Sequence, residues 1–65
     1  MNQREQLRRM KRALISIRAR AKGHPAFDVE LYDRRDLSAL EDVGGDVFDW
    51  TVTAIEADDA LEAMR

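Results

Sequence analysis

A break near residue 23 divides the chain and limits what can fold on either side of it. Before the break, apolar residues recur at spacings of three and four, among mostly basic or polar positions: Leu7, Met10, Leu14, Ile17 and Ala21. This is the period of an amphipathic helix, and the stripe is expected to be buried in a core or an oligomer. Gly23 is expected to cap the helix in the left-handed conformation, and Pro25 cannot continue it. The sequence therefore predicts a helix over residues 3–22.

Two segments after the break alternate between apolar and polar residues. In residues 27–32, Phe27, Val29 and Leu31 alternate with charged or polar neighbours. Residues 47–55 alternate in the same way and are rich in β-branched and aromatic side chains. A period of two is typical of half-buried strands, so a strand is expected in each segment.

The remaining segments have the composition of short helices. Asp36 is placed to be the N-cap of a helix over residues 36–43 that Gly44 and Gly45 would end. The same glycine pair also suits a hairpin turn, so residues 36–43 are expected to form a short helix or a turn. Near the C-terminus, Ala, Leu, Met and Glu predict a helix over residues 57–64.

Together these elements predict a single α+β domain over residues 1–65. The long N-terminal amphipathic helix would lie on a small sheet of two or three strands, with a short C-terminal helix beside it. A chain of 65 residues without cysteine has a thin core and no disulfide to stabilise it. Two strands also leave open edges, so we expect a homodimer that completes the core.

The charges are divided between the two parts of the chain. Residues 1–22 hold eight bases and one acid, whereas residues 23–65 hold three bases and twelve acids. The basic face is expected to comprise Arg4, Arg8, Arg9, Lys11, Arg12 and Arg18. An acidic, partner-binding face is expected to comprise Glu41, Asp42, Asp46, Asp49, Asp58 and Asp59. This asymmetry bears on the choice of partner, because oppositely charged surfaces attract one another.

The chain offers little for catalysis or for metal binding. It has no cysteine, and its one histidine, His24, lies beside the helix stop, where we expect an exposed loop. Asp42, Asp46 and Asp49 surround the glycine pair, but their spacing departs from a calcium-binding loop. We therefore expect no enzyme activity, no metal, no cofactor and no small-molecule substrate. Charged residues make up 37% of the chain, so we also expect no membrane span.

The aromatic residues after the break are candidates for the core or for an interface. Phe48 and Trp50 fall on one face of the strand expected over residues 47–55, where Phe48 would enter the core. Trp50 would be in the core or at an interface. Tyr32 falls on the opposite face from Phe27 in the other expected strand, so it is the better candidate for an exposed contact.

These observations favour a non-enzymatic protein-protein interaction module that binds a host protein through a charged surface. In size and charge alone the chain is similar to the small inhibitors and regulators of phages and mobile elements, anti-CRISPR proteins among them. That resemblance implies an inhibitor or regulator. The absence of cysteine leaves the redox compartment open, and the cytoplasm is the default expectation. The alternative is a small DNA- or RNA-binding regulator that uses the basic N-terminal helix. A third interpretation is that the basic face forms ion pairs with the acidic part of its own chain or of a second subunit.

Overall fold

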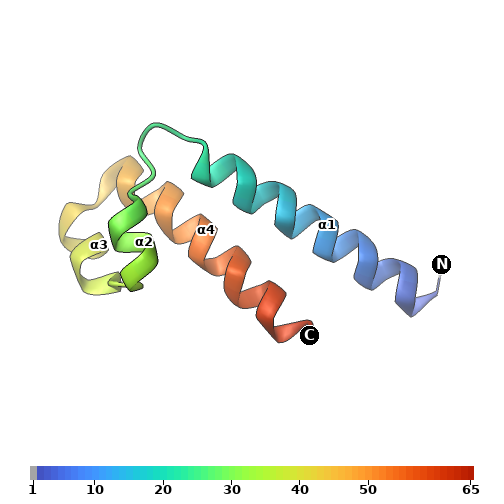
Figure 1. Cartoon of the computed structure of the whole chain (residues 1–65). Coiled ribbons are helices and arrows are strands. Elements are labelled where there is room, and N and C mark those ends of the chain that lie inside the picture. Colours follow the sequence, from blue (N-terminus) through green and yellow to red (C-terminus); the bar gives the residue numbers. More distant parts are fainter. Residues whose placement is uncertain (1) are drawn as a thin grey trace.

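The expected α+β fold is wrong, because the computed structural model, which describes residues 2–65, contains helices and no strand within that range. The chain forms α1 (Gln3–Lys22), α2 (Val29–Arg34), α3 (Leu37–Val43) and α4 (Gly45–Ala63). The long helices α1 and α4 run in opposite directions, and the short helices α2 and α3 lie together at one end (Figure 1). The fold is therefore a small all-helical one.

Helix α1 has the bounds that the apolar spacing predicts. The side chain of Asn2 caps its first turn by accepting a hydrogen bond of 2.8 Å from the Glu5 amide. At the other end the Gly23 amide donates to the Ala19 carbonyl at 3.1 Å. Gly23 has φ −84°, so the expected left-handed cap is wrong, and the helix ends in an ordinary right-handed turn before Pro25.

The strand expected over residues 27–32 is wrong, because this segment contains the first turns of α2. Asp28 is its N-cap, and the Asp28 carboxylate accepts a hydrogen bond of 3.0 Å from the Leu31 amide. Capping by Asp28 starts a helix where the alternating pattern suggests an extended chain. Arg35 ends α2 in the left-handed conformation, with φ 54°.

Helix α3 forms where the sequence predicts a short helix. The Asp36 side chain caps it and accepts a hydrogen bond of 3.1 Å from the Ala39 amide. Gly44 and Gly45 both have positive φ, 63° and 57°, which glycine adopts without steric cost. The glycine pair therefore separates two helices, and the hairpin alternative is wrong.

The strand over residues 47–55 and the separate helix over residues 57–64 are wrong, because both belong to α4. Thr51, Ala54 and Ile55 are buried, and this spacing of three and four residues is helical. The buried Thr51 hydroxyl accepts a hydrogen bond of 3.0 Å from the Asp28 amide, which ties the loop before α2 to α4. Helical geometry also separates Phe48 from Trp50, which do not share a face.

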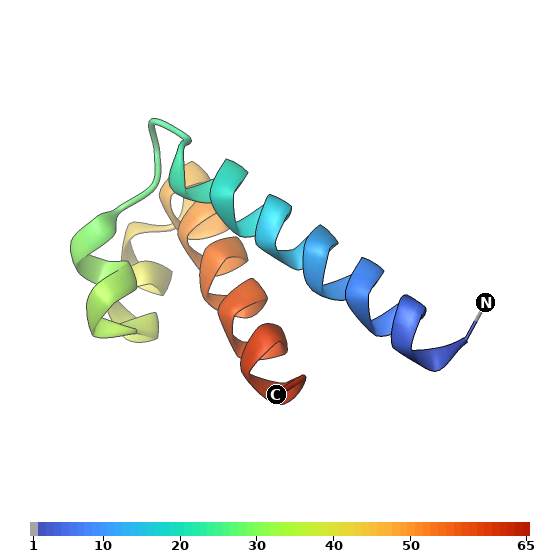
Figure 2. The ribbon, with the colours of Figure 1, turned by 45° about the vertical axis from the view of Figure 1, so that its right-hand side comes forward.

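The core is small and lies where α1 meets the other three helices. Its buried residues are Ala21, Tyr32, Leu40, Ala54 and Ile55, with Phe27, Leu31, Val47, Phe48, Trp50 and Val52 packed against them. From this end α1 and α4 diverge towards the two termini (Figures 1 and 2). Every residue from Asn2 to Met10 is exposed. Only the C-terminal half of α1 is therefore part of the core.

Truncating Leu40 should test this description of the core. Leu40 is fully buried, so Leu40→Ala removes packed methyl groups and leaves a cavity, at a cost of about 2–5 kcal/mol. That is comparable with the stability of so small a domain, and thermal unfolding followed by circular dichroism should show a large fall in melting temperature. Leu37→Ala in the same helix is the control, because Leu37 is 50% exposed. An equal fall in melting temperature with both substitutions would show that Leu40 is not a core residue.

Candidate functional site

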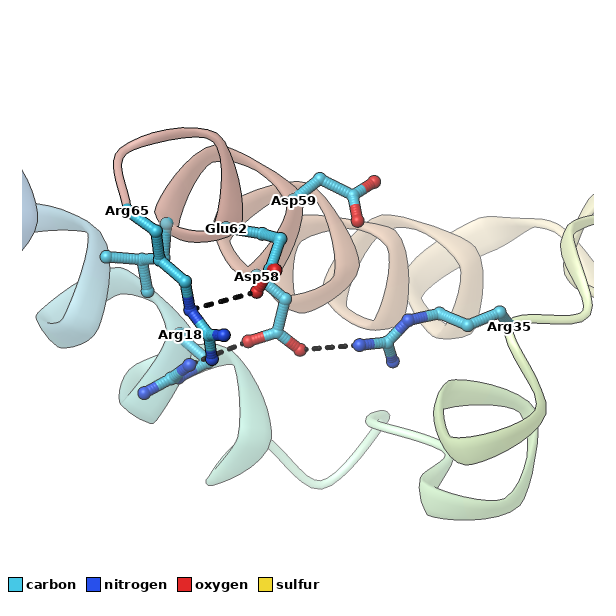
Figure 3. A pocket seen from close by; sticks show the side chains of 7 residues that line it. Arg18, Arg35, Asp58, Asp59, Glu62 and Arg65 are labelled. Carbon is cyan, nitrogen blue, oxygen red and sulfur yellow. Dashed lines mark hydrogen bonds and ion pairs between the residues drawn. The ribbon is translucent and has the colours of Figure 1, made fainter.

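Asp58 on α4 joins three parts of the chain through its carboxylate. Arg18 on α1 donates a hydrogen bond of 2.8 Å to Oδ1. Arg35, the C-cap of α2, donates at 2.9 Å to Oδ2, and the Tyr32 hydroxyl donates to the same oxygen. Figure 3 shows the two guanidinium groups approaching the carboxylate from opposite sides. Asp58 therefore links α1 and the end of α2 to α4.

Tyr32 is held in place by contacts on several sides. Its ring lies against Phe27, with ring centroids 5.1 Å apart, and the Arg35 guanidinium lies 4.5 Å from the Tyr32 ring centroid. The Lys22 ammonium approaches the same ring at 5.0 Å. Only 8% of Tyr32 is exposed, so the expectation of an exposed contact residue is wrong. Cation–π contacts and hydrogen bonding of this kind hold an aromatic side chain in position.

The charges of this cluster are stable around neutral pH. Burial raises the pKa of Asp58, but the hydrogen bonds from Tyr32, Arg18 and Arg35 outweigh it and lower that pKa below its ordinary value. Burial and the hydrogen bond to Asp58 raise the pKa of Tyr32. Asp58 thus stays ionised and Tyr32 stays protonated, so neither group exchanges protons near pH 7. The cluster is suited to structural support and not to acid–base chemistry.

A hollow of about 310 Å³ opens beside this cluster, lined by Arg18, Arg35, Asp58, Asp59, Leu61, Glu62 and Arg65. Its three arginines and its three acids, Asp58, Asp59 and Glu62, balance in number; Arg18 and Arg35 pair with Asp58, and Arg65 pairs with Glu62 at 3.3 Å (Figure 3). Within residues 2–65 no group of three or more His, Asp or Glu side chains is arranged to hold a metal ion. The hollow therefore has no unbalanced charge with which to select an ionic ligand.

His24 and Trp50 form a second contact that the sequence did not suggest. Their rings stack with centroids 4.0 Å apart and an angle of 9° between the planes. The His24 Nδ1 atom accepts a hydrogen bond of 3.0 Å from the Ala26 amide. The expectation of an exposed His24 is wrong, because this side chain is half-buried against Trp50. Both residues hold the loop after α1 against α4.

The structure distributes the acidic residues over two helices. Glu41 and Asp42 lie on α3, Asp46, Asp49 and Asp59 lie on α4, and all five are exposed. Asp58 differs from them, because it is mostly buried and both of its oxygens accept hydrogen bonds within the chain. Its carboxylate is therefore already engaged, whereas the other five remain accessible to a partner.

The basic residues of α1 are mostly unpaired. Of the eight bases in this segment, only Arg18 forms an ion pair among residues 2–65. Arg4, Arg8, Arg9 and Arg12 are exposed, and Lys11 is half-buried. Arg8, Arg9 and Arg12 line a shallow hollow of about 200 Å³ together with Glu5. Pairing with the acidic part of the same chain therefore accounts for one base of the basic face.

The apolar stripe of α1 is buried at one end only. Ala21 is fully buried, whereas Ile17, Met10 and Leu7 are 36%, 51% and 46% exposed. Beside it runs an apolar groove of about 320 Å³ between α1 and α4, lined by Leu14, Ile17, Thr53, Glu56, Ala57 and Ala60. Two surfaces of α1 are thus open to partners, one basic and one apolar.

The buried position of Asp58 could have been found from the sequence. Thr51, Ala54 and Asp58 follow one another at spacings of three and four, which places them on one face if residues 47–58 are helical. Its partners could not have been found in this way, because Arg18 lies 40 residues away and Tyr32 lies 26 residues away.

The chain matches no protein-family model, and comparison with curated proteins and with solved structures finds no similar chain. Within the part of the chain that the structure describes, no helix is both long and apolar enough to cross a membrane.

Neutralising Asp58 should destabilise the fold in a pH-dependent way. Asp58→Asn weakens the hydrogen bonds to Arg18 and Arg35, and we expect a loss of about 1–2 kcal/mol at pH 7. Because the pKa of Asp58 is lower in the folded protein, its contribution is complete above the unfolded-chain value of about 3.9. It is lost as the pH falls through the folded-state pKa.

Urea unfolding of the wild type and of Asp58→Asn between pH 7 and pH 2 measures this effect. The difference in unfolding free energy should shrink at the acidic end. Asp59→Asn is the matched control, because the neighbouring Asp59 is exposed, and it should behave as the wild type at pH 7. A difference between wild type and Asp58→Asn that is independent of pH would contradict the role assigned to the Asp58 charge.

Proposed function

We propose that the protein is a non-enzymatic interaction module, an inhibitor or regulator that binds an acidic surface of another protein through α1. The observation that carries the proposal is that the N-terminal half of α1 is exposed and its bases form no ion pair among residues 2–65. Unpaired bases on one helix attract an acidic partner and orient it during encounter. The proposed contact is the outward face, which we define as Arg8, Arg12, Ile15 and Ala19.

The outward face lies on the side of α1 opposite the apolar stripe. Its residues recur at spacings of four, three and four, so they align along the helix. Ile15 is 50% exposed and lies near the middle of this line, between Arg12 of the preceding turn and Ala19 of the following turn. An exposed apolar side chain beside charged ones resembles the centre and rim of a protein interface.

The composition of this face favours a protein partner over a nucleic acid. The exposed Ile15 side chain would find no apolar group to contact on a phosphate backbone. Glu5 lies among the arginines that line the shallow hollow. A carboxylate at that position repels phosphate but can pair with a base on a protein partner. The net charge of −2 also opposes non-specific attraction to nucleic acid.

A second candidate function is DNA or RNA binding by the same helix. The observation that favours it is the clustering of Arg8, Arg9 and Arg12 around the hollow of about 200 Å³. Guanidinium groups bind phosphate oxygens in a bidentate manner, and such binding weakens steeply as salt is added. The two candidates therefore differ in their salt dependence and in the partner that they retain.

Reversing charge on the outward face should abolish partner binding while the fold survives. Exposed charge changes usually alter stability by no more than about 0.5 kcal/mol, so Arg8→Glu/Arg12→Glu should retain the wild-type circular dichroism spectrum. The matched variant Asp46→Lys/Asp49→Lys reverses two exposed acids on α4. Both variants and the wild type are used to isolate partners from a lysate of the source organism, and each is titrated with duplex DNA and with RNA at two salt concentrations.

The proposal predicts that a protein partner is lost with the arginine variant and kept with the aspartate variant. Loss of the partner only with the aspartate variant would place binding on the acidic face and contradict the proposed surface. Steeply salt-dependent binding of duplex DNA or RNA that Arg8→Glu/Arg12→Glu removes would support the second candidate instead.

A further inference from the structure

The groove between α1 and α4 is an apolar surface that the chain does not cover. Leu14 and Ile17 line one side, and Thr53, Ala57 and Ala60 line the other. A neighbouring hollow of about 220 Å³ extends it through Arg20 and Trp50 towards the core. Towards the N-terminus the apolar stripe continues through Met10 and Leu7, about half of whose surface is exposed. Contiguous apolar surfaces of this kind mark interaction sites.

The rims of this groove carry opposite charges. Arg20 stands on the α1 side and Glu56 on the α4 side, and neither forms an ion pair among residues 2–65. A partner that places an acidic group opposite the α1 rim and a basic group opposite the α4 rim would pair with both. A second copy of the chain, rotated by 180°, does this, because its α4 carries the acidic group and its α1 carries the basic group.

We propose that a second copy of this chain occupies the groove and forms a two-fold symmetric dimer. A two-fold interface is self-complementary, because each patch meets an identical patch in the opposite sense. An axis parallel to the long helices brings α1 of each copy against α4 of the other, and Arg20 of one copy meets Glu56 of the second copy. Because α1 and α4 run in opposite directions, each long helix then has antiparallel neighbours (Figure 1). The result is a four-helix bundle.

The sizes of the facing side chains suit such an arrangement. Ala60 on α4 is small and only half-buried, so the larger Leu14, Ile17 and Met10 of the opposite copy can pack against it. Burying these side chains would enlarge a core that has only Leu40 and Thr51 as its largest fully buried members. The outward face of α1 lies on the other side of the helix and stays accessible, so this inference does not depend on the proposed function.

The dimer is tested by sedimentation equilibrium of the full chain and of two charge variants. In an Arg20→Glu dimer both rims are acidic, and in a Glu56→Lys dimer both rims are basic. Each substitution replaces two symmetry-related attractions by repulsions, so each should raise the Kd of the homodimer about tenfold. An equimolar mixture of the two variants should form a heterodimer at concentrations at which each variant alone is monomeric.

Two further variants separate loss of the dimer from loss of the fold and from changes on the outward face. Met10→Asp places a charge in the stripe at a site that is 51% exposed in the single chain, so it should dissociate the dimer and preserve the helical circular dichroism spectrum. Arg12→Glu lies on the outward face and should leave the Kd unchanged. A wild-type chain that stays monomeric near millimolar concentration would overturn the proposal. So would a dimer that Arg20→Glu, Glu56→Lys and Met10→Asp do not weaken, because it would be formed by another surface.

Discussion

The contact on which the arrangement of helices depends is the carboxylate of Asp58. It receives Arg18 from α1, and it receives Tyr32 and Arg35 from α2 and its cap. The apolar core contributes few large side chains, with Ala21 and Ala54 among its fully buried members. Small residues allow helices to approach closely but add little buried area. The orientation of α1 and α2 on α4 therefore depends on directional hydrogen bonds more than it would in a larger domain.

The position of Asp58 also explains why α1 is only partly covered. Arg18 contacts Asp58 and Ala21 is buried, so α1 is attached to the core over its C-terminal half. Beyond that point α1 and α4 diverge (Figure 2), and the residues from Asn2 to Met10 are exposed. A helical segment of only about ten residues is marginal in water without packing. Its two uncovered faces differ in chemistry, which is the physical basis for assigning them to different partners.

Local signals predicted α1 and α3, whereas the Asp28 cap that starts α2 and the helical course of α4 were missed. The bounds of α1 follow from its apolar spacing, and the start of α3 follows from the Asp36 cap. Alternation over six to nine residues was misleading in residues 27–32 and 47–55, because the β-branched residues of these segments are compatible with helices once packing stabilises them. Of the basic face, Arg4, Arg8, Arg9 and Arg12 are exposed, whereas Lys11 is half-buried and Arg18 pairs with Asp58. The burial of Tyr32 was not predicted, because its hydroxyl contacts Asp58, 26 residues away.

The chain itself holds only the C-terminal half of α1, and in the proposed dimer a second copy packs on the apolar stripe that the chain leaves uncovered. Amide hydrogen exchange measured at low and at high protein concentration tests this directly. Amides in residues 15–22 should be protected at both concentrations, whereas amides in residues 6–13 should gain protection only as concentration rises. If the protection of residues 6–13 were the same at both concentrations, whether high or absent, a second copy would not cover this part of α1.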